Sequence, residues 1–311
     1  MILLLSEKPY ALKMLQEAFE QFAPDDRYCL ANDERAEQAD TVVCWFPPND
    51  YLMKLPHLKL IHSMGAGISH LSKEWLHSAY PVCRVVDEDH QQGMLEYVLW
   101  GVLYFQRDFD LARQHQLRGE WVQYPRRRKE DICIAVLGLG KLGGFVATQL
   151  AQMGYRVLGF ATAHKELEKV NVFSAKAGEK DSLYKMLSQA DIVVNLLPLT
   201  EQTHHIIDAE FLAALPDGAA LIQCGRGEHI DEKALLEVLQ QQRLRGAILD
   251  VFREEPLPID HPFRSEERIV ITPHIASHAS LETVVKQVYE NRRRVLSNEA
   301  LLNEVNKEKG Y

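Results

Sequence analysis

The sequence predicts an α/β fold made of two doubly wound domains, and three observations support this prediction. Short apolar segments of strand character alternate with segments of helical periodicity along the chain. A second series of such segments begins at Ile132, after a long helical stretch. The last predicted helix follows the last strand, so the chain is expected to return to its starting domain. We therefore assign residues 1–92, completed by residues 279–311, to one domain and residues 93–278 to the other.

The first domain is predicted to hold a small open sheet and a helix, residues 11–22, whose apolar side chains recur at the helical period. Pro47 and Pro48 end one strand, because proline cannot donate a ladder hydrogen bond. Another strand runs into the loop SMGAGISH, and open α/β sheets bind ligands at such strand ends. The predicted strands are residues 1–5, 41–45, 58–63 and 82–86.

The second domain is predicted to open with a long helix, residues 94–118. Its apolar side chains recur at i, i+3 and i+4 spacing, at Leu95, Val98, Leu99, Val102 and Phe105. Strands are predicted from Ile132 and at residues 156–160, 191–197, 219–223, 246–251 and 269–272. Helices are predicted between them at residues 141–153, 182–189 and 231–241, and after the last strand at residues 281–296.

Composition and charge exclude several classes of function. The 311 residues include Lys+Arg 35 against Asp+Glu 44, which gives a net charge of -9. Because nucleic-acid binding requires a basic face, we expect no nucleic-acid partner. No apolar run reaches the roughly 20 residues that a membrane-spanning helix needs. The opening MILLLSEKPY lacks the basic leader of a signal peptide, so we predict that it is a strand.

The five cysteines indicate a reducing compartment. Cys29, Cys44, Cys83, Cys133 and Cys224 are dispersed in apolar segments, and none of them forms a CxxC pair. Such a set is typical of reduced thiols in a protein core. We therefore predict a cytoplasmic protein with no metal site and no cysteine nucleophile.

Gly138, Gly140 and Gly143 form a GxGxxG pattern directly after a predicted strand and at the start of a helix. The first glycine permits a tight turn, the second lets a pyrophosphate approach the backbone, and the third lets helix and strand pack closely. The helix N-terminus, at Lys141 and Leu142, offers N–H groups to the phosphates. This context predicts a dinucleotide cofactor, against the alternative of a tight turn without a ligand.

The end of the next strand indicates which nicotinamide cofactor binds. An unphosphorylated adenosine ribose usually meets a carboxylate there, but this chain has no acid from Ala161 to Lys165, and the first one is Glu166. Thr162, His164 and Lys165 supply a hydroxyl, an imidazole and an ammonium, which suit a 2′-phosphate. We therefore predict that NADP(H) is preferred, with NAD(H) as the alternative.

Further cofactor-binding residues are expected where other buried strands end. Residues 195–200 form a polar turn at such an end, although a plain strand-to-helix turn explains them equally well. The residues that we place at the cofactor on this basis are Leu197, Pro198, Thr203, Cys224 and Gly225.

Arg226, Glu255 and His274 stand in three separate strings, QCGRGEHIDE, LDVFREEPLP and IVITPHIA. Arg226 lies between two glycines, and its planar cation suits a carbonyl beside a carboxylate, although a structural ion pair is an equal explanation. A lone histidine or a loop glutamate is usually structural. As a pair, however, Glu255 would orient the ring of His274 and favour its proton-donating form. We therefore predict that these three residues are catalytic and that Arg226 also binds the substrate.

The loop Gly65-Ala66-Gly67-Ile68 follows a predicted strand and offers exposed N–H groups. Such a loop forms a small anion nest, and we predict that it binds the carboxylate of the substrate. Trp45 also lies at a strand end, where it either forms a wall of the substrate pocket or belongs to the core.

Seven strings of the chain together resemble the D-isomer-specific 2-hydroxyacid dehydrogenase family. They are GAGISH, MLEYVLWGVLYFQR, GLGKLGG, NLLPLTEQT, GRGEHIDEKAL, LDVFREEPLP and TPHIA, and they span nearly the whole chain. The short N-terminal domain, the string CWFPP and the ending EVNKEKGY are similar to the glyoxylate/hydroxypyruvate reductase A branch. The resemblance implies a Rossmann domain inserted in a flavodoxin-like substrate domain, and a homodimer formed through the nucleotide domain.

The resemblance also implies a role for each matching residue. Arg226 would bind the substrate carbonyl and carboxylate, His274 would be the acid/base, and Glu255 would orient it. Asp250 would lie near the nicotinamide carboxamide, and the loop of residues 65–68 would hold the substrate carboxylate.

The chain departs from the family pattern at two places. Ser69 stands where the family often has aspartate. Ala161-Thr162-Ala163 replaces the arginine-bearing strand end of the NADP-using branch.

Together these observations predict a reductase of short 2-oxoacids, such as glyoxylate or hydroxypyruvate. Hydride would pass from nicotinamide C4 to substrate C2 while Arg226 polarises the carbonyl and His274 delivers the proton. Two alternatives stay open. One is an enzyme of the same fold with a larger 2-oxoacid, including a D-lactate or aromatic substrate. The other is a cofactor-sensing binding protein that has lost turnover.

Overall fold

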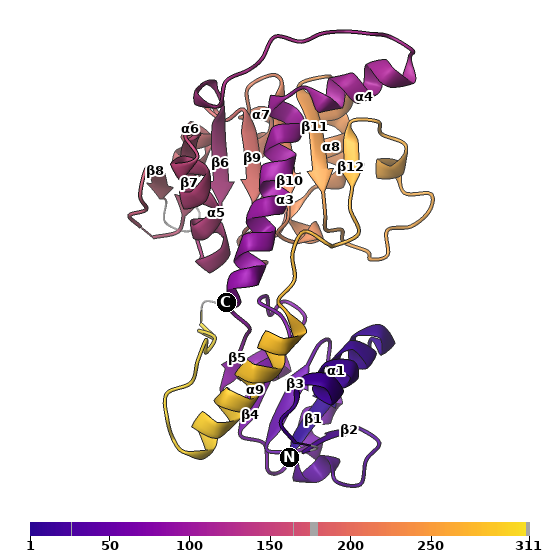
Figure 1. Ribbon diagram of the computed structural model, residues 1–311, viewed down its shortest axis with the longest axis vertical. Helices are drawn as coiled ribbons and strands as arrows, with labels where there is room; N and C mark the ends of the chain where they lie inside the picture. The colour runs from indigo at the N-terminus through magenta and orange to yellow at the C-terminus, as the bar shows by residue number, and fades with distance from the viewer. Residues whose placement is uncertain (26, 164, 175–179, 309–311) are drawn as a thin grey trace. The chain divides into compact units, whose positions relative to one another are not determined.

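The computed structural model divides the chain into two compact units (Figure 1). Unit 1 comprises Met1–His90 and His278–Tyr311, and unit 2 comprises Gln91–Ser277. The sequence analysis placed these divisions after residues 92 and 278. The structure describes residues 1–25, 27–163, 165–174 and 180–308.

Unit 1 is built on a five-stranded parallel sheet. Its strands lie in the order β2 (Tyr28–Leu30), β1 (Ile2–Leu5), β3 (Thr41–Cys44), β4 (Leu60–Ser63) and β5 (Val82–Cys83). This is a flavodoxin-like order, and its switch point lies between β1 and β3. The carboxyl ends of these strands are where a parallel sheet of this kind places its ligand-binding loops.

Alternating side chains of this sheet face two layers. Ile2 and Leu4 pack against helices α1 (Pro9–Phe22) and α9 (Leu281–Leu296). Leu3 and Leu5 face the opposite layer, which includes α2 (Lys73–Leu76) and the 3-10 turns η1 (Ala36–Gln38) and η2 (Asn49–Lys54). The side of β5 is closed by the C-terminal segment, because Val305 N–H donates to Val82 O (2.8 Å) and Arg84 N–H donates to Asn303 O (3.1 Å).

Unit 2 is built on a seven-stranded parallel sheet. Its strands lie in the order β12 (Ile269–Ile271), β11 (Leu244–Leu249), β10 (Ala219–Gln223), β9 (Ile192–Asn195), β6 (Cys133–Leu137), β7 (Arg156–Ala161) and β8 (Val170–Ser174). The strand order reverses between β6 and β9. The loops that leave these two strands therefore border the crevice in which doubly wound sheets bind their ligands.

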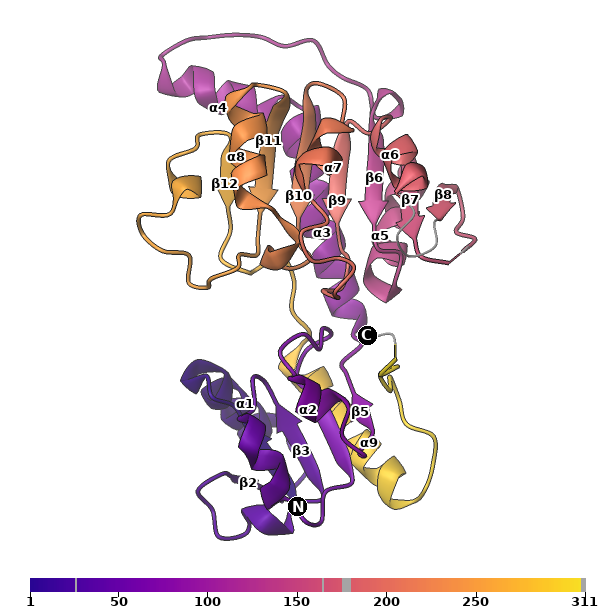
Figure 2. The same cartoon turned by 180° about the vertical axis from the view of Figure 1, so that it is seen from behind.

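Helices cover both faces of the second sheet (Figures 1 and 2). Helices α3 (Glu88–Gln106) and α5 (Lys141–Gln152) pack on one face, against residues such as Ile134 and Val136 of β6. Helices α6 (Asp181–Leu187), α7 (Ala209–Ala213) and α8 (Glu232–Gln240) pack on the other, against Ala135 and Leu137. The prediction of an α/β fold with two parallel sheets is confirmed.

The single long helix predicted at residues 94–118 is wrong. The chain forms α3 and a separate helix, α4 (Phe109–Leu117), and Asp108 between them has a left-handed φ of 55°. Arg245 of β11 explains the break, because its guanidinium binds Asp108 (2.6 Å) and Asp110 (2.6 and 2.7 Å). This partly buried ion pair holds both carboxylates beside the sheet. A continuous helix would place Asp108 and Asp110, which are two positions apart, on opposite sides of the helix, so that both could not bind Arg245.

Several predicted bounds also change. Strand β5 ends at Cys83 rather than at residue 86, and β2, β8, α2 and α7 were not predicted. Within the described ranges, no helix is both long enough and apolar enough to cross a membrane.

Candidate active site

The glycine-rich turn connects β6 to α5 at the point where the strand order of unit 2 reverses. Gly138 has a φ of 89°, and a Cβ there would lie 2.8 Å from Leu196 O. A Cβ on Gly143 would lie 1.9 Å from Gly138 O. Beside Gly140, in contrast, a Cβ would meet nothing within 4 Å. The turn is thus packed against its neighbours at Gly138 and Gly143 and open at Gly140, as an incoming pyrophosphate requires.

The N-terminus of α5 and the end of β7 both border this turn. Lys141 is exposed at the first position of the helix, and Leu142 is half-buried. Lys165 Nζ donates a hydrogen bond to Leu139 O (2.6 Å), which holds the ammonium beside the turn. Thr162 is exposed. These residues fit a dinucleotide, whereas His164, the remaining residue predicted at this point, lies outside the described residues.

The loop after β9 is fixed by its own hydrogen bonds. Leu197 N–H donates to Asn195 Oδ1 (3.1 Å), and Thr203 Oγ1 donates to Pro198 O (2.7 Å). Thr203 Oγ1 also accepts from Thr200 N–H (2.8 Å). The predicted cofactor residues Leu197, Pro198 and Thr203 therefore belong to one rigid turn at the carboxyl end of β9.

A buried polar network that the sequence analysis missed lies behind this turn. Asn195, Gln223 and His229 are each fully buried. Asn195 Nδ2 donates to Gln223 Oε1 (2.7 Å) and to His229 Nδ1 (2.9 Å), and Arg226 N–H also donates to His229 Nδ1 (3.1 Å). Nδ1 is therefore an acceptor, and Nε2 carries the proton and donates to Pro198 O (3.3 Å). Burial lowers the pKa of His229 to about 4.

Arg226 sits on a turn that has no room for larger neighbours. A Cβ on Gly225 would lie 2.7 Å from His229 Nδ1, and a Cβ on Gly227 would lie 2.0 Å from the carbonyl carbon of Phe252. The two glycines thus let the turn pack against the buried network on one side and against the loop after β11 on the other. Arg226 Nη1 donates to Gly225 O (2.7 Å).

Two carboxylates, those of Glu228 and Glu255, act on the charge of Arg226. Burial lowers the pKa of the Arg226 guanidinium, and the carboxylates of Glu228 and Glu255 oppose this shift. Arginine stays protonated in proteins even so. The site therefore holds a permanent cation beside the loop that carries Glu255.

Glu255 and His274 form the pair predicted from the sequence. His274 Nδ1 lies 2.8 Å from Glu255 Oε2, and Phe252 N–H donates to Glu255 Oε1 (2.9 Å). Burial alone would raise the pKa of Glu255, but the hydrogen bonds from His274 and Phe252 and the nearby charges lower it. The carboxylate stays ionised and accepts the Nδ1 proton, so any proton that the ring transfers must be carried by Nε2.

Asp250 fixes the loop that carries His274. The Asp250 carboxylate is buried and accepts from Thr272 Oγ1 (2.6 Å), Ile275 N–H (2.8 Å) and Ala276 N–H (2.9 Å). His274 N–H donates to Asp250 O (2.8 Å), and His274 has a left-handed φ of 56°. Three of the acceptor positions of Asp250 thus hold the histidine loop; its predicted place near the nicotinamide stays a prediction.

Tyr97 continues the hydrogen-bond chain of Asp250 and Thr272 into the core. Its hydroxyl lies 2.5 Å from Thr272 Oγ1, and because Thr272 donates to Asp250, Tyr97 must be the donor. Cys224 lies close by and is buried; burial, with the charge of Asp250, raises the pKa of its thiol. The thiol stays protonated, so this predicted cofactor residue would contribute a neutral, apolar surface. All five cysteines are buried and free of disulfides.

The predicted substrate residues Trp45 and Gly65-Ala66-Gly67-Ile68 belong to unit 1. The Trp45 ring lies 4.0 Å, between centroids, from that of His70. A Cβ on Gly65 would lie 2.7 Å from Trp45 Cζ3. Trp45 is half-buried rather than part of the core, and it packs directly on the first residue of the loop.

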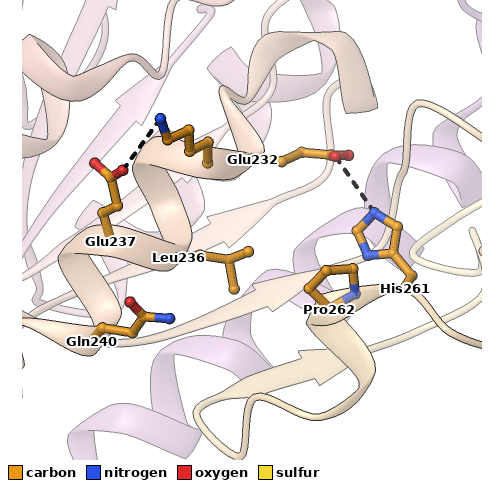
Figure 3. A pocket seen from close by; sticks show the side chains of 7 residues that line it. Glu232, Leu236, Glu237, Gln240, His261 and Pro262 are labelled. Atoms are coloured by element: carbon orange, nitrogen blue, oxygen red, sulfur yellow. Dashed lines mark ion pairs between the residues drawn. The ribbon is translucent and has the colours of Figure 1, made fainter.

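Another glutamate–histidine pair of unit 2 lines a hollow between α8 and the segment before β12 (Figure 3). Glu232 Oε2 of α8 lies 3.4 Å from His261 Nε2, just before the 3-10 turn η5 (Pro262–Arg264). The other residues that line this hollow are Lys233, Leu236, Glu237, Gln240 and Pro262. The lining residues include no arginine. The pair therefore provides a control for Glu255 and His274.

Comparisons with known proteins identify similar chains. Residues 99–276 match the family model described as D-isomer specific 2-hydroxyacid dehydrogenase, NAD binding domain. The whole chain is similar to the crystal structure of a D-isomer specific 2-hydroxyacid dehydrogenase family protein from Klebsiella pneumoniae 342. The identity is 42% and the TM-score 0.93, over 99% of this chain and 97% of that one.

Two further crystal structures contain a bound nicotinamide cofactor. One is a D-isomer specific 2-hydroxyacid dehydrogenase from Xanthobacter autotrophicus Py2 in complex with NADPH and MES, with 33% identity, a TM-score of 0.90, and coverage of 100% and 99% of the two chains. The other is an NADPH-dependent glyoxylate/hydroxypyruvate reductase from Sinorhizobium meliloti in complex with NADP and sulfate, with 28% identity, a TM-score of 0.89, and coverage of 100% and 99%.

Proposed function

The chain belongs to the D-isomer specific 2-hydroxyacid dehydrogenase family, and from this premise we propose that it reduces short 2-oxoacids, such as glyoxylate and hydroxypyruvate, with NADPH. The observation that carries the proposal is the contact of 2.8 Å between His274 Nδ1 and Glu255 Oε2, together with the packing of the turn that carries Arg226 against Phe252 and Arg253. A proton donor and a cation are what the reduction of a carbonyl requires.

Each of the three residues has one task in this proposal. Arg226 binds the carbonyl and carboxylate of the oxoacid and stabilises the negative charge that develops on the carbonyl oxygen. His274 delivers the Nε2 proton to that oxygen, and Glu255 holds the ring by its Nδ1 proton. Bound NADPH would supply the hydride to carbon 2.

The cofactor is held, in this proposal, by the glycine-rich turn and by the turn that contains Leu197, Pro198 and Thr203. The preference for NADPH is supported by Lys165, which hydrogen-bonds to Leu139 O of the glycine-rich turn. It is also supported by the absence of any acid from residue 161 to residue 165 of the sequence. Because lysine makes a single-point contact, we expect a preference on the order of tenfold. Lys165→Ala should reduce the ratio of kcat/KM for NADPH to that for NADH.

We propose a homodimer formed through unit 2. The supporting observation is the set of large apolar side chains exposed along α3, α4 and the segment after them. These are Trp100, Phe109, Leu117 and Trp121, with exposures of 41, 50, 70 and 93%. Sedimentation should show a dimer at micromolar protein concentration, and a monomer would reject the proposal.

The buried free cysteines support a cytoplasmic location.

The substrate is tested with a panel of 2-oxoacids at fixed NADPH. Glyoxylate and hydroxypyruvate should give the highest kcat/KM, and pyruvate and phenylpyruvate should be poorer substrates. Preference for phenylpyruvate or pyruvate would assign the enzyme to a larger oxoacid. No oxidation of NADPH with any member of the panel would instead indicate a cofactor-binding protein without turnover.

A further inference from the structure

In the loop Gly65-Ala66-Gly67-Ile68, three consecutive backbone N–H groups point away from the donors of unit 1 that bind the loop carbonyls. The carbonyl oxygens of residues 65, 66 and 67 all have donors within unit 1. Ser63 Oγ lies 3.1 Å from Gly65 O and 3.3 Å from Gly67 O. Val85 N–H donates to Gly65 O (3.1 Å), and Arg84 Nη1 donates to Ala66 O (3.2 Å).

The direction of the N–H groups follows from the geometry of the peptide bond. The loop peptides are trans, since the only cis bond in the described part of the chain is Glu255-Pro256. In a trans peptide the N–H points opposite to the carbonyl that shares its plane. With the three carbonyls bound from within, the N–H groups of Ala66, Gly67 and Ile68 face the other side. Among the described residues, these N–H groups have no acceptor.

Arg84 is the charged member of this arrangement. It follows β5 and is half-buried. Within the part of the chain that the structure describes, no carboxylate forms an ion pair with it. Burial without such a partner lowers the pKa of its guanidinium. A cation in this setting costs free energy unless an anion approaches it. Its hydrogen bond to Ala66 O places that uncompensated charge directly on the loop.

We propose that Arg84 is a positioning residue for the substrate carboxylate, acting through the peptide that joins Ala66 to Gly67. The guanidinium fixes this peptide and polarises it, so that the Gly67 N–H becomes a stronger donor. Ser63 fixes the two flanking peptides in the same way. This inference deepens the proposed function, on which it rests. It explains why a loop without any charged side chain of its own can select a carboxylate.

The experiment measures the binding of oxamate, a small carboxylate analogue of a 2-oxoacid, to the full-length protein saturated with NADPH. Titration calorimetry gives the Kd without any need for turnover. Arg84→Met should raise the Kd for oxamate and the KM for glyoxylate by about tenfold or more, the effect of a lost charged hydrogen bond. The decrease in kcat should be smaller than the rise in KM, and the Kd for NADPH should not change. Arg84→Lys should recover part of the affinity, because it restores the charge but not the planar fork.

Arg292→Met is the matched control. Arg292 is also a largely buried arginine of unit 1, but it is paired with Asp40 (2.7 Å) and does not contact the loop. The substitution Arg292→Met should lower the thermal stability of the protein and leave the Kd for oxamate unchanged. Wild-type affinity in Arg84→Met, or an equal loss of affinity in Arg292→Met, would overturn the inference. If the wild type binds oxamate through Arg84 but reduces no 2-oxoacid, the inference stands and the proposed function fails.

Discussion

Glu255 connects the two charged side chains on which the proposed reaction depends. One of its oxygens holds His274, the other accepts from Phe252 N–H, and its charge opposes the effect of burial on Arg226. The pKa of Glu255 is lowered, so the carboxylate stays ionised throughout the neutral range and loses its charge only in acid. Two predictions at the scale of single residues follow from this arrangement.

Glu255→Gln removes a negative charge that stabilises the protonated ring of His274. Reduction uses the protonated ring, so the pH above which kcat for reduction falls should move to a lower value. The pH profile of kcat with saturating glyoxylate and NADPH measures this shift. Glu254→Gln, which changes the exposed neighbouring acid, should leave the profile unchanged. An unaltered profile in Glu255→Gln would count against the pairing.

Arg226→Lys keeps the charge but loses the planar fork that binds a carbonyl and a carboxylate together. The KM for glyoxylate should rise by about tenfold to a hundredfold, and kcat should fall, because charged hydrogen bonds are lost in both the bound and the transition state. The KM for NADPH should barely move. A rise in the nucleotide KM alone would place Arg226 in the cofactor site instead.

At the scale of elements, the site is a set of loops joined by buried polar residues. His229 connects the turn after β10 with Pro198 of the turn after β9. Asp250, at the end of β11, connects that strand with the loop after β12. The strands of a parallel sheet bring these loops to one edge. The buried residues then fix the loops relative to one another, and this should matter for stability as well as for catalysis.

His229 makes the stability of unit 2 depend on pH. Its pKa is about 4 in the folded protein and 6.5 for a free histidine. Between these values the unfolded chain binds more protons, so stability falls as the pH is lowered from 6.5 to 4, by up to about 3 kcal/mol. Calorimetric unfolding across this range should show that the stability of unit 2 depends less on pH in His229→Gln than in the wild type. His62→Gln, at a buried histidine of unit 1 whose pKa is also about 4, should flatten only the transition of unit 1. If the stability of unit 2 depended on pH as steeply in His229→Gln as in the wild type, the lowered pKa of His229 would not be its cause.

The sequence predicted elements well where local pattern decides them. Helix α9 and strand β10 have the predicted bounds, because their apolar periodicity matches the core that they meet. The break at Asp108 was not predictable from local pattern, since it depends on Arg245, 137 residues away. Strand β8 was missed because its side chains are mostly half-buried, so the apolar signal is weak.

The candidate site also contains some features that the local sequence predicts and others that depend on residues far apart in the chain. The chemistry of the two strings predicted that Glu255 and His274 form a pair, but their separation of 19 positions does not by itself predict the observed distance of 2.8 Å. The role of His229 was missed although the residue stands in the same string as Arg226. Its function depends on Asn195, 34 positions away, which only the folded sheet brings into contact.

At the scale of the whole molecule, the proposed proton donor and the proposed carboxylate-binding loop belong to different units. Arg226, Glu255 and His274 all belong to unit 2, and so does the glycine-rich turn. The loop of residues 65–68 and Arg84 belong to unit 1. The proposed carboxylate-binding residues of unit 1 and the proposed proton donor of unit 2 can therefore be substituted separately. Substitutions of the loop or of Arg84 should change oxoacid binding, and substitutions of His274 should change turnover.

The most direct test of the account is the rate of NADPH oxidation by glyoxylate in the wild type, in His274→Asn and in His261→Asn. His274→Asn should bind NADPH normally and lower kcat by about 10²–10⁴, the usual loss of a general acid. His261→Asn, which breaks the pair with Glu232, should keep the wild-type kcat. Near wild-type turnover in His274→Asn, with NADPH bound equally well, would contradict the assignment of His274 as the proton donor.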